Sequence, residues 1–264
     1  MIVQWSSGSA EDSMWEDILS SLAGTVSRHP WFQARARMSV ALLRELGVLP
    51  PARILDAGCG WGTNLLALER AGYRPIGLDI SGRSLERLDR PGRELIQADL
   101  TQPIPANAER YDAVMALDVI EHLDDDGRAV ATLARLTKPG GVVIVGTPAL
   151  PELFSEFDAV QGHRRRYLPG SLRQAFEGSG LLVEQILWWG SWMVPLLKRQ
   201  RRGAAPSSRA AESPAETYRR YLNLPPWPLP LAMRLAFALD QPRTLRGALY
   251  TGTSLFALAR RPLG

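Results

Sequence analysis

Short apolar runs alternate with helical patterns between residues 53 and 148, and this alternation limits the fold more than any other feature. The runs are RILDAG, PIGLD, ELIQAD, YDAVMAL and GVVIVGTP. The segments between them repeat their apolar residues about every 3.6 positions, as helices do. Strands that alternate with helices form a parallel sheet covered on both faces. We therefore expect an α/β fold with a doubly wound sheet.

Acidic residues stand where four of these runs end: Asp56, Asp79, Asp99 and Asp118. Ligands of doubly wound sheets bind at the carboxyl ends of the strands. Each acid by itself also fits a helix cap or a turn. Because four follow one another at the same edge, they favour a ligand site.

The first run continues into the glycine loop ILDAGCGWGTN at residues 54–64, which carries Gly58, Gly60 and Gly62. Glycines at a helix start let the backbone approach a ligand closely. The dinucleotide fingerprint needs a third glycine where this sequence has Thr63. Asp79 is placed to accept hydrogen bonds from ribose hydroxyls and to repel a 2′-phosphate. With Asp99 placed for the adenine amine, an adenosine ligand is expected.

These segments, with GLDIS, QADL, YDAVMALDVIEHLDD and LARLTKPGGVVIVGTP, resemble successive motifs of the class I S-adenosylmethionine-dependent methyltransferases. The resemblance is greatest to the ubiquinone-biosynthesis-like branch. It implies a Rossmann-like sheet of seven strands, the last antiparallel and formed by GTSLFALAR. It also implies S-adenosylmethionine as cofactor and S-adenosylhomocysteine as product.

The resemblance implies roles for single residues along the cofactor. Gly58 and Gly60 line its methionine portion, Asp79 holds the ribose, and Cys59 is a small core residue in preference to a nucleophile. Asp99 with Leu100 faces adenine, and Asp118 with Val119 closes the site near the sulfonium. The full set expected at the cofactor is Trp31, Arg35, Arg37, Asp56, Gly58, Cys59, Gly60, Asn64, Asp79, Ile80, Asp99, Leu100, Asp118, Val119 and His122.

Two segments that flank the core indicate which subfamily of these methyltransferases the chain resembles. HPWFQARARMSVALLREL, an expected helix at 29–46, is similar to an HWWFxxR element with Pro30 in place of a tryptophan, and FDAVQGHRRRYLPGSL is similar to a GHxRRY element. The subfamily with these elements is associated with sugar and polyprenol-linked pathways. A guanidinium suits the cofactor's carboxylate, and Arg35 is the first candidate and Arg37 the second. The alternative is a solvent-facing arginine pair.

A general base is needed if the methyl acceptor is a hydroxyl or an ammonium. His163 in GHRRRY is the first candidate. His122 in DVIEHL is expected to pack against the cofactor in preference to acting as a base. Tyr167 and Asp158 are the alternatives. His29, beside Trp31 and Phe32, is expected in a lid, and Arg164–Arg166 either hold an acidic substrate or form a solvated surface.

The chain is expected to have four parts. A helix at 168–180 and a sixth strand at 181–189 precede an insertion, and residues 198–217 are expected to form a mobile linker. The insertion can cover the substrate, form a dimer contact or lie on a membrane through WWGSWMVPLLKRQRR. The parts are 1–47, an N-terminal helical lid; 48–190, the cofactor-binding core; 191–250, the basic linker and helical insertion; and 251–264, the final strand and tail.

Composition excludes several classes of protein. The only cysteine, Cys59, leaves no internal disulfide and no thiolate metal cluster, and no metal is expected. No secretory signal is visible in residues 1–25, and the longest apolar stretch, 186–197, is too short for a bilayer. A cytoplasmic, soluble or membrane-peripheral protein is expected. The net charge of +4 is concentrated in KRQRRG and GHRRRY without interleaved aromatic residues, so nucleic acid is not an expected partner.

The expected function is transfer of a methyl group to oxygen, in preference to nitrogen or carbon. The acceptor is a small molecule, a natural product, a saccharide or a lipid-linked precursor, and the protein is a monomer or a homodimer. One alternative is a protein that binds the cofactor without transferring the methyl group. A nicotinamide-dependent dehydrogenase is disfavoured by Thr63 and by DVIEHL.

Overall fold

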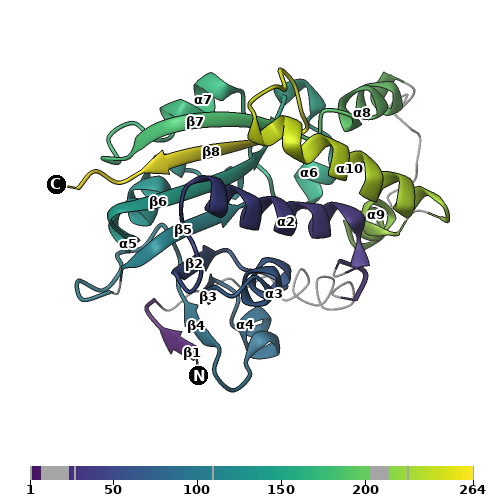
Figure 1. Ribbon diagram of the computed structural model, residues 1–264. Helices are drawn as coiled ribbons and strands as arrows, with labels where there is room; N and C mark the ends of the chain where they lie inside the picture. The colour runs from purple at the N-terminus through teal and green to yellow at the C-terminus, as the bar shows by residue number, and fades with distance from the viewer. Residues whose placement is uncertain are drawn as a thin grey trace.

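The computed structural model describes residues 2–6, 24–26, 28–108, 110–202, 214–224 and 226–263. Within these residues eight strands form one sheet in the order β1-β4-β3-β2-β5-β6-β8-β7 (Figure 1). The strands are β1 (Ile2–Gln4), β2 (Arg53–Ala57), β3 (Arg74–Asp79), β4 (Glu94–Gln97), β5 (Tyr111–Leu117), β6 (Thr137–Pro148), β7 (Leu182–Trp189) and β8 (Ser254–Arg260).

Neighbouring strands of the sheet pair in parallel except at β8, which is antiparallel to both β6 and β7. Ile144 of β6 lies opposite Leu258 of β8, which lies opposite Gln185 of β7. The last strand is thus inserted between two strands that precede it in the chain. This confirms the expected doubly wound α/β sheet with an antiparallel last strand.

The sheet has one strand more than the seven expected, because β1 adds to its edge. Ile2 pairs with Leu95 and Gln4 pairs with Gln97 of β4. Three residues are too few to show a period-2 pattern, so the sequence could not reveal this strand. The part expected to be helical, residues 1–47, therefore begins with a strand.

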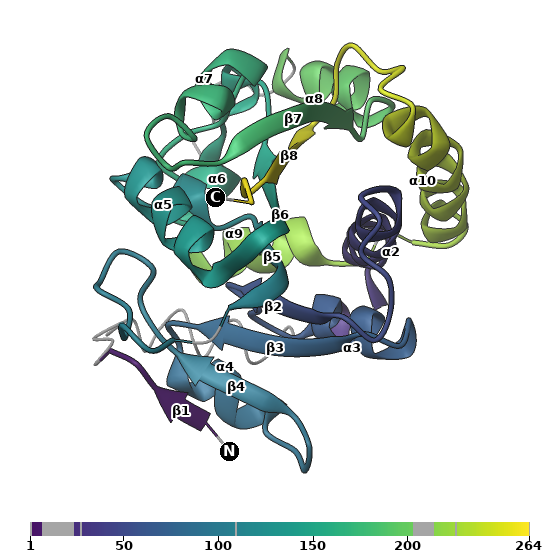
Figure 2. The same ribbon diagram turned by 60° about the vertical axis from the view of Figure 1, so that its left-hand side comes forward.

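Helices cover both faces of the sheet (Figure 2). Alternate residues of β5 point to opposite faces: Val114 packs in the cluster that contains Leu133 of α5, and Met115 in the cluster that contains Met38 of α2 and Phe237 of α10. The helices are α2 (Pro30–Glu45), α3 (Thr63–Arg70), α4 (Gly82–Leu88), α5 (Asp126–Leu136), α6 (Glu156–Val160), α7 (Pro169–Gln174), α8 (Met193–Arg202), α9 (Pro214–Leu222) and α10 (Leu229–Leu245), with 3-10 turns η1 (Ile120–His122) and η2 (Pro151–Leu153).

The insertion before β8 is helical, as expected, and its helices extend into the stretch expected to be a mobile linker. α8 continues to Arg202 and α9 begins at Pro214, so residues 198–202 and 214–217 of that stretch are helix. The rest of that stretch, 203–213, lies outside the described residues. The helix expected at 168–180 is shorter, ending at Gln174. No helix in the described ranges combines the length and the apolar character needed to cross a bilayer.

WWGSWMVPLLKRQRR, the segment for which a membrane contact was one alternative, packs its tryptophans against the core. Trp189 is 1% exposed and stacks on Phe237 of α10, with ring centroids 5.0 Å apart. Trp192 makes an edge contact with the same ring. These contacts fix α10 against β7, with Trp189 buried and Trp188 and Trp192 half-buried.

Candidate functional site

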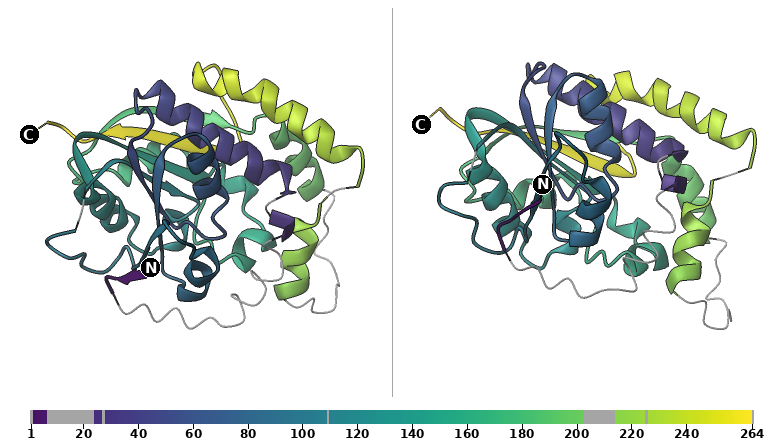
Figure 3. Two further views of the ribbon diagram at one scale, coloured as in Figure 1. Left: turned by 60° about the horizontal axis from the view of Figure 1, so that its bottom comes forward. Right: turned by 90° about the horizontal axis from the view of Figure 1, so that it is seen from below.

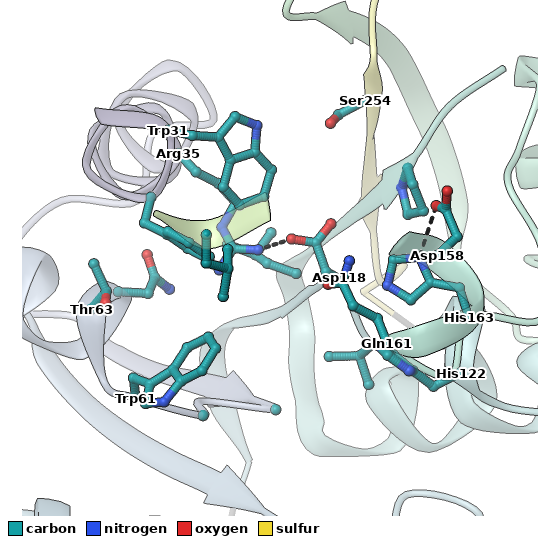
Figure 4. Close-up of a pocket in the computed structure, with 18 of the residues that line it drawn as sticks. Trp31, Arg35, Trp61, Thr63, Asp118, His122, Asp158, Gln161, His163 and Ser254 are labelled. Atoms are coloured by element: carbon teal, nitrogen blue, oxygen red, sulfur yellow. Dashed lines mark hydrogen bonds and ion pairs between the residues drawn. The ribbon is translucent and has the colours of Figure 1, made fainter. Parts of the chain in front are cut away.

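A cavity of about 1000 Å³ opens at the carboxyl ends of the central strands (Figure 4). Two groups of residues face each other across it. We call Gly58, Gly60, Asp79 and Asp99 the loop side, and His122, Asp158, His163 and Arg166 the histidine side. Asp118 lies between the two sides. Residues of α2 and of the insertion close the rest of the wall: Trp31, Phe32, Arg35, Met193, Leu197, Arg220, Tyr221, Leu222 and Met233.

The loop side is formed by the turn from β2 into α3. Gly58 has a φ of +77°, and a Cβ atom there would lie 2.3 Å from Cγ2 of Val119. Only glycine therefore lets the backbone pass beside Val119. The Gly60 N–H donates to Oδ2 of Asp79 over 2.8 Å, which joins the loop to the end of β3.

The four strand-end acids all line this cavity, as expected. Asp79 also accepts from the Ser81 N–H, and Asp99 accepts from the N–H and the hydroxyl of Thr101. Asp56 is buried, accepts from Asn64 Nδ2 over 2.9 Å, and leaves its Oδ2 without a hydrogen-bond partner among the described residues. Burial raises the pKa of Asp56 to about 6.

Arg35 of α2 forms an ion pair with Asp118 across the middle of the cavity. Its guanidinium lies 4.8 Å from the ring centroid of Trp31, a cation–π contact. Burial lowers the pKa of Arg35 to about 10, so it stays charged at neutral pH. The pair joins a residue expected to hold the cofactor's carboxylate to one expected near the sulfonium.

The second arginine candidate, Arg37, does not line the cavity. It is exposed, and burial together with the charge of Arg234 lowers its pKa. Since the two residues of a helix at i and i+2 point about 200° apart, Arg35 and Arg37 could not both reach one ligand group. The remaining residues expected at the cofactor all line the cavity: Trp31, Asp56, Gly58, Cys59, Gly60, Asn64, Asp79, Ile80, Asp99, Leu100, Asp118, Val119 and His122.

Cys59 packs with Leu65, Leu85 and Leu95 and is 6% exposed. Burial raises the pKa of its thiol well above the ordinary value. A thiol held neutral is a poor nucleophile. The structure therefore agrees with a small core residue.

On the histidine side, Asp158 and His163 form a hydrogen-bonded pair. Nδ1 of His163 lies 3.2 Å from Oδ1 of Asp158 (Figure 4). Asp158 also accepts from Arg166 Nε over 2.7 Å and from the N–H and hydroxyl of Ser155 over 2.8 Å. Burial acts to raise the pKa of Asp158, but the bonds from His163 and Arg166 hold it below its usual range. An ionised Asp158 accepts only, so the proton of His163 lies on Nδ1. Its Nε2 carries the lone pair and lies 4.0 Å from Oε1 of the buried Glu121.

Glu121 and His122 lie behind this pair. The centroid of the His122 ring lies 4.7 Å from that of the His163 ring, with one ring edge on to the other. Burial, and to a smaller extent the neighbouring His163, lowers the pKa of His122 to about 4. Glu121 is fully buried, its carboxylate oxygens have no hydrogen-bond partner among the described residues, and burial raises its pKa to about 8. Ligand atoms of Glu121, His122 and His163 lie within 4.8 Å of one another, the one set among the described residues that could hold a metal.

The alternatives for the base do not fit. The Tyr167 hydroxyl donates to Asp126 Oδ2 over 2.7 Å, and Tyr167 does not line the cavity. Burial, with that bond to Asp126, raises its pKa far above the ordinary value. Asp158 lines the cavity, but its low pKa makes it a weak base.

Each side chain of the run Arg164–Arg166 is bound to another part of the chain, although that of Arg164 remains 50% exposed. Arg164 donates to the backbone carbonyl of His122 and pairs with Asp124. Arg165 pairs with Asp126 and binds two backbone carbonyls of the same loop. Arg166 binds Asp158 and the carbonyl of Ala149. Through these bonds the run joins the loop after β5 to the loop after β6.

Two features were missed at the level of sequence. Glu121 stands next to His122 in DVIEHL, but nothing in that string shows that its carboxyl is buried. The apolar wall was missed because its members come from distant segments, as in the stacked rings of Phe157 and Tyr221, 4.6 Å apart.

His29, expected in a lid, lines the cavity and caps α2 by accepting from the Trp31 N–H.

Comparison with known proteins places the chain in a family. Residues 29–186, more than half of the chain, match the family described as a methyltransferase domain. The ubiquinone biosynthesis O-methyltransferase of Alkalilimnicola ehrlichii is 38% identical over 108 residues, 39% of this chain and 44% of that protein. The malonyl-(acyl-carrier protein) O-methyltransferase of Pseudescherichia vulneris is 32% identical over 170 residues, 61% of this chain and 64% of that protein. The match thus spans less than two thirds of either relative.

Solved structures share the fold. The (4+2)-cyclase SpnF superposes with a TM-score of 0.60 at 17% identity, covering 100% of this chain and 98% of that one. Phosphoethanolamine N-methyltransferase 2 of Haemonchus contortus, solved with S-adenosyl-L-methionine, superposes with a TM-score of 0.54 at 17% identity. The match covers 86% of this chain and 52% of that one. The chain therefore belongs to the methyltransferase domain family, in agreement with the expected relationship to class I S-adenosylmethionine-dependent methyltransferases.

Proposed function

We propose that this protein transfers a methyl group from S-adenosylmethionine to an oxygen, in preference to nitrogen or carbon, of a small-molecule, natural-product, saccharide or lipid-linked acceptor. The observation that carries the proposal is one cavity with a glycine loop on one side and a hydrogen-bonded Asp158–His163 pair on the other. O-methyltransferases among the relatives support the choice of oxygen.

The loop side fits the proposed cofactor. Gly58 and Gly60 line the cavity, and the turn at Gly58 needs glycine because a Cβ there would collide with Val119. Arg35 and Asp118 carry the two charges that complement the carboxylate and ammonium of an amino acid. Asp79 is proposed for the ribose, because its carboxylate lines the cavity at the end of β3 and is held there by the N–H groups of Gly60 and Ser81. Asp99 and Leu100 are proposed for adenine.

The cofactor supplies an electrophilic methyl group on a sulfonium, which leaves as a neutral thioether. The chain has to align the acceptor and take its proton. Alignment alone is worth about 7–11 kcal/mol in model reactions. The Phe32 ring makes T-shaped contacts with the rings of Trp31 and Trp61 at the cavity wall, and these side chains help to exclude water.

His163 is proposed as the general base. Asp158 holds its Nδ1–H, which orients the ring and leaves Nε2 to accept the hydroxyl proton of the acceptor as the O–CH₃ bond forms. The charged imidazolium that results is stabilised by Asp158. His122, with a pKa near 4, stays neutral and packs against the His163 ring.

The test combines calorimetry with a turnover assay. S-adenosylhomocysteine is expected to bind and NAD is not; binding of NAD alone would overturn the proposal. His163→Ala is expected to lower kcat ~10²-fold or more on a responsive acceptor while leaving S-adenosylhomocysteine affinity unchanged. A variant that keeps the full rate would remove His163 from the base role.

The alternative is a protein that binds the cofactor without methyl transfer. The likeness to a structure described as a cyclase shows that this fold does not by itself fix the reaction. Tight S-adenosylhomocysteine binding with no methyl release across a broad acceptor panel would favour this alternative.

A further inference from the structure

The outer face of α10 carries an uncovered apolar stripe. Leu231, Leu235 and Leu239 are 45%, 59% and 73% exposed, and Trp227, just before the helix, is 77% exposed. Residues spaced by four lie on the same side of a helix. Figures 1 and 3 show α10 at the margin of the molecule beside α2.

The opposite face of α10 is fixed to the core, so the leucines cannot turn inward. Phe237 is 2% exposed and stacks on Trp189. Asp240, 3% exposed, accepts from the Gly190 N–H over 2.7 Å and from the Ser191 hydroxyl over 2.7 Å. A helix that is apolar on both faces needs a cover on each, and the structure supplies one on the inner face.

Positive charge borders the stripe. Arg234, Arg243 and Arg246 are exposed on or directly after α10, and Arg37 of α2 lies close enough to Arg234 for the charge of Arg234 to lower its pKa. The one acidic residue of α10, Asp240, faces the core. On the helix wheel Arg234 lies at one edge of the leucine stripe and Arg243 at the other, since each residue advances about 100°.

We propose that this face, the α10 stripe with its arginines, docks on an anionic lipid surface. A helix with apolar residues between basic edges lies in the plane of the bilayer interface, and tryptophan is favoured at that depth. A second copy of the chain would be a poorer cover, because a two-fold contact through the stripe brings arginines against arginines. This face is distinct from the WWGSWMVPLLKRQRR segment, in which Trp189 is buried and Trp188 and Trp192 are half-buried.

Co-sedimentation of the full chain with vesicles tests the proposal. Binding to mixed phosphatidylglycerol and phosphatidylcholine vesicles is expected, with much weaker binding to pure phosphatidylcholine and a loss at high salt. Leu235→Gln with Leu239→Gln is expected to lower the partition coefficient ~10-fold or more. The matched control is Leu182→Gln, an equally exposed leucine (63%) on β7, which should bind as the parent protein does.

Replacing the arginines tests the electrostatic part. Arg234→Gln, Arg243→Gln and Arg246→Gln together should weaken binding roughly fivefold per residue, the equivalent of about 1 kcal/mol each near a charged surface. The control is Arg83→Gln with Arg87→Gln on α4, both exposed. S-adenosylhomocysteine calorimetry on every variant shows that it is folded, and it separates failure of this proposal from failure of the proposed function.

Three results would overturn the proposal. One is no binding to anionic vesicles by the parent protein. Another is unchanged binding after the leucine replacements. The third is a concentration-dependent dimer in sedimentation velocity that the same leucine replacements abolish, which would make a second copy the occupant.

Discussion

The two sides of the cavity are assembled in different ways. On the loop side two acids each accept from the residue two positions further on, Asp79 from Ser81 and Asp99 from Thr101, and the Gly60 bond to Asp79 spans 19 positions. On the histidine side Asp158 binds His163 and Arg166 five and eight positions away, but the surrounding loops are joined over 42 positions by Arg164 and 41 positions by Tyr167. Both sides therefore have a local part, and the histidine side depends in addition on segments that meet only in the folded chain.

If that contrast is correct, the largest effect follows from breaking the Asp158–His163 pair. Asp158→Asn removes the charge that fixes the imidazole, and kcat is expected to fall ~10²-fold or more with unchanged S-adenosylhomocysteine affinity. The double variant with His163→Ala should be no slower than His163→Ala alone, because residues that act as a unit are not additive. Additive losses in the double variant would contradict a shared role.

The next effect tests the loop side. Gly58→Ala adds a Cβ at a φ of +77° beside Val119, and is expected to cost about 1–2 kcal/mol for the backbone conformation plus about 1–3 kcal/mol for the collision. Thermal unfolding and S-adenosylhomocysteine calorimetry measure both losses. Gly47→Ala is the matched control, with a φ of +76° and no atom within 4 Å of the added Cβ. It should show the backbone cost alone and bind normally.

A smaller effect is expected for the proposed ribose acid. Asp79→Asn keeps the size of the side chain and loses its charge, so S-adenosylhomocysteine affinity should fall by about 1.5–3 kcal/mol. Asp112→Asn is the control, because its carboxylate also accepts a backbone N–H, that of Arg53 over 2.8 Å, but lies outside the cavity. Equal affinities of the two variants would argue against the ribose assignment.

The smallest effect concerns pH and Glu121. With a pKa of about 8 in the fold and about 4.5 unfolded, its carboxyl holds a proton in the folded state that the unfolded chain has released, so stability falls as pH rises between these values. The pKa of His122 is lowered to about 4, so below pH 6.5 this group makes the stability rise with pH. Between about pH 6.5 and 8 the free energy of unfolding should fall by about 1–2 kcal/mol, and Glu121→Gln should flatten this slope in urea titrations. A slope that persists in the variant would assign it to another group.

Much of the fold was predictable because its signals are local. Alternating strands and helices, the glycine loop and the acid at each strand end are each contained within a few residues. β1 was not predictable, since Ile2–Gln4 is too short to carry a pattern, and neither was the extension of α8 and α9 into the expected linker.

The candidate site also has a part that was predictable from the sequence and a part that was not. Arg35 could be proposed from its helix, but its pairing with Asp118 depends on how α2 packs over β5. The arginine run looked like a surface or an anion site because a sequence gives charges without their partners. Burial of Glu121 likewise depends on segments that meet only in the folded chain.

The place of β8 has a consequence for how the molecule is made. β7 joins the sheet through β8 alone, so a ribosome delivers β7 and the whole α8–α10 insertion before residues 254–260 emerge to link them to β6. Such non-local pairing is slow and leaves strand edges open meanwhile. The loop side can assemble during synthesis, whereas β7, which leads into the insertion, is joined to the sheet only when β8 has emerged.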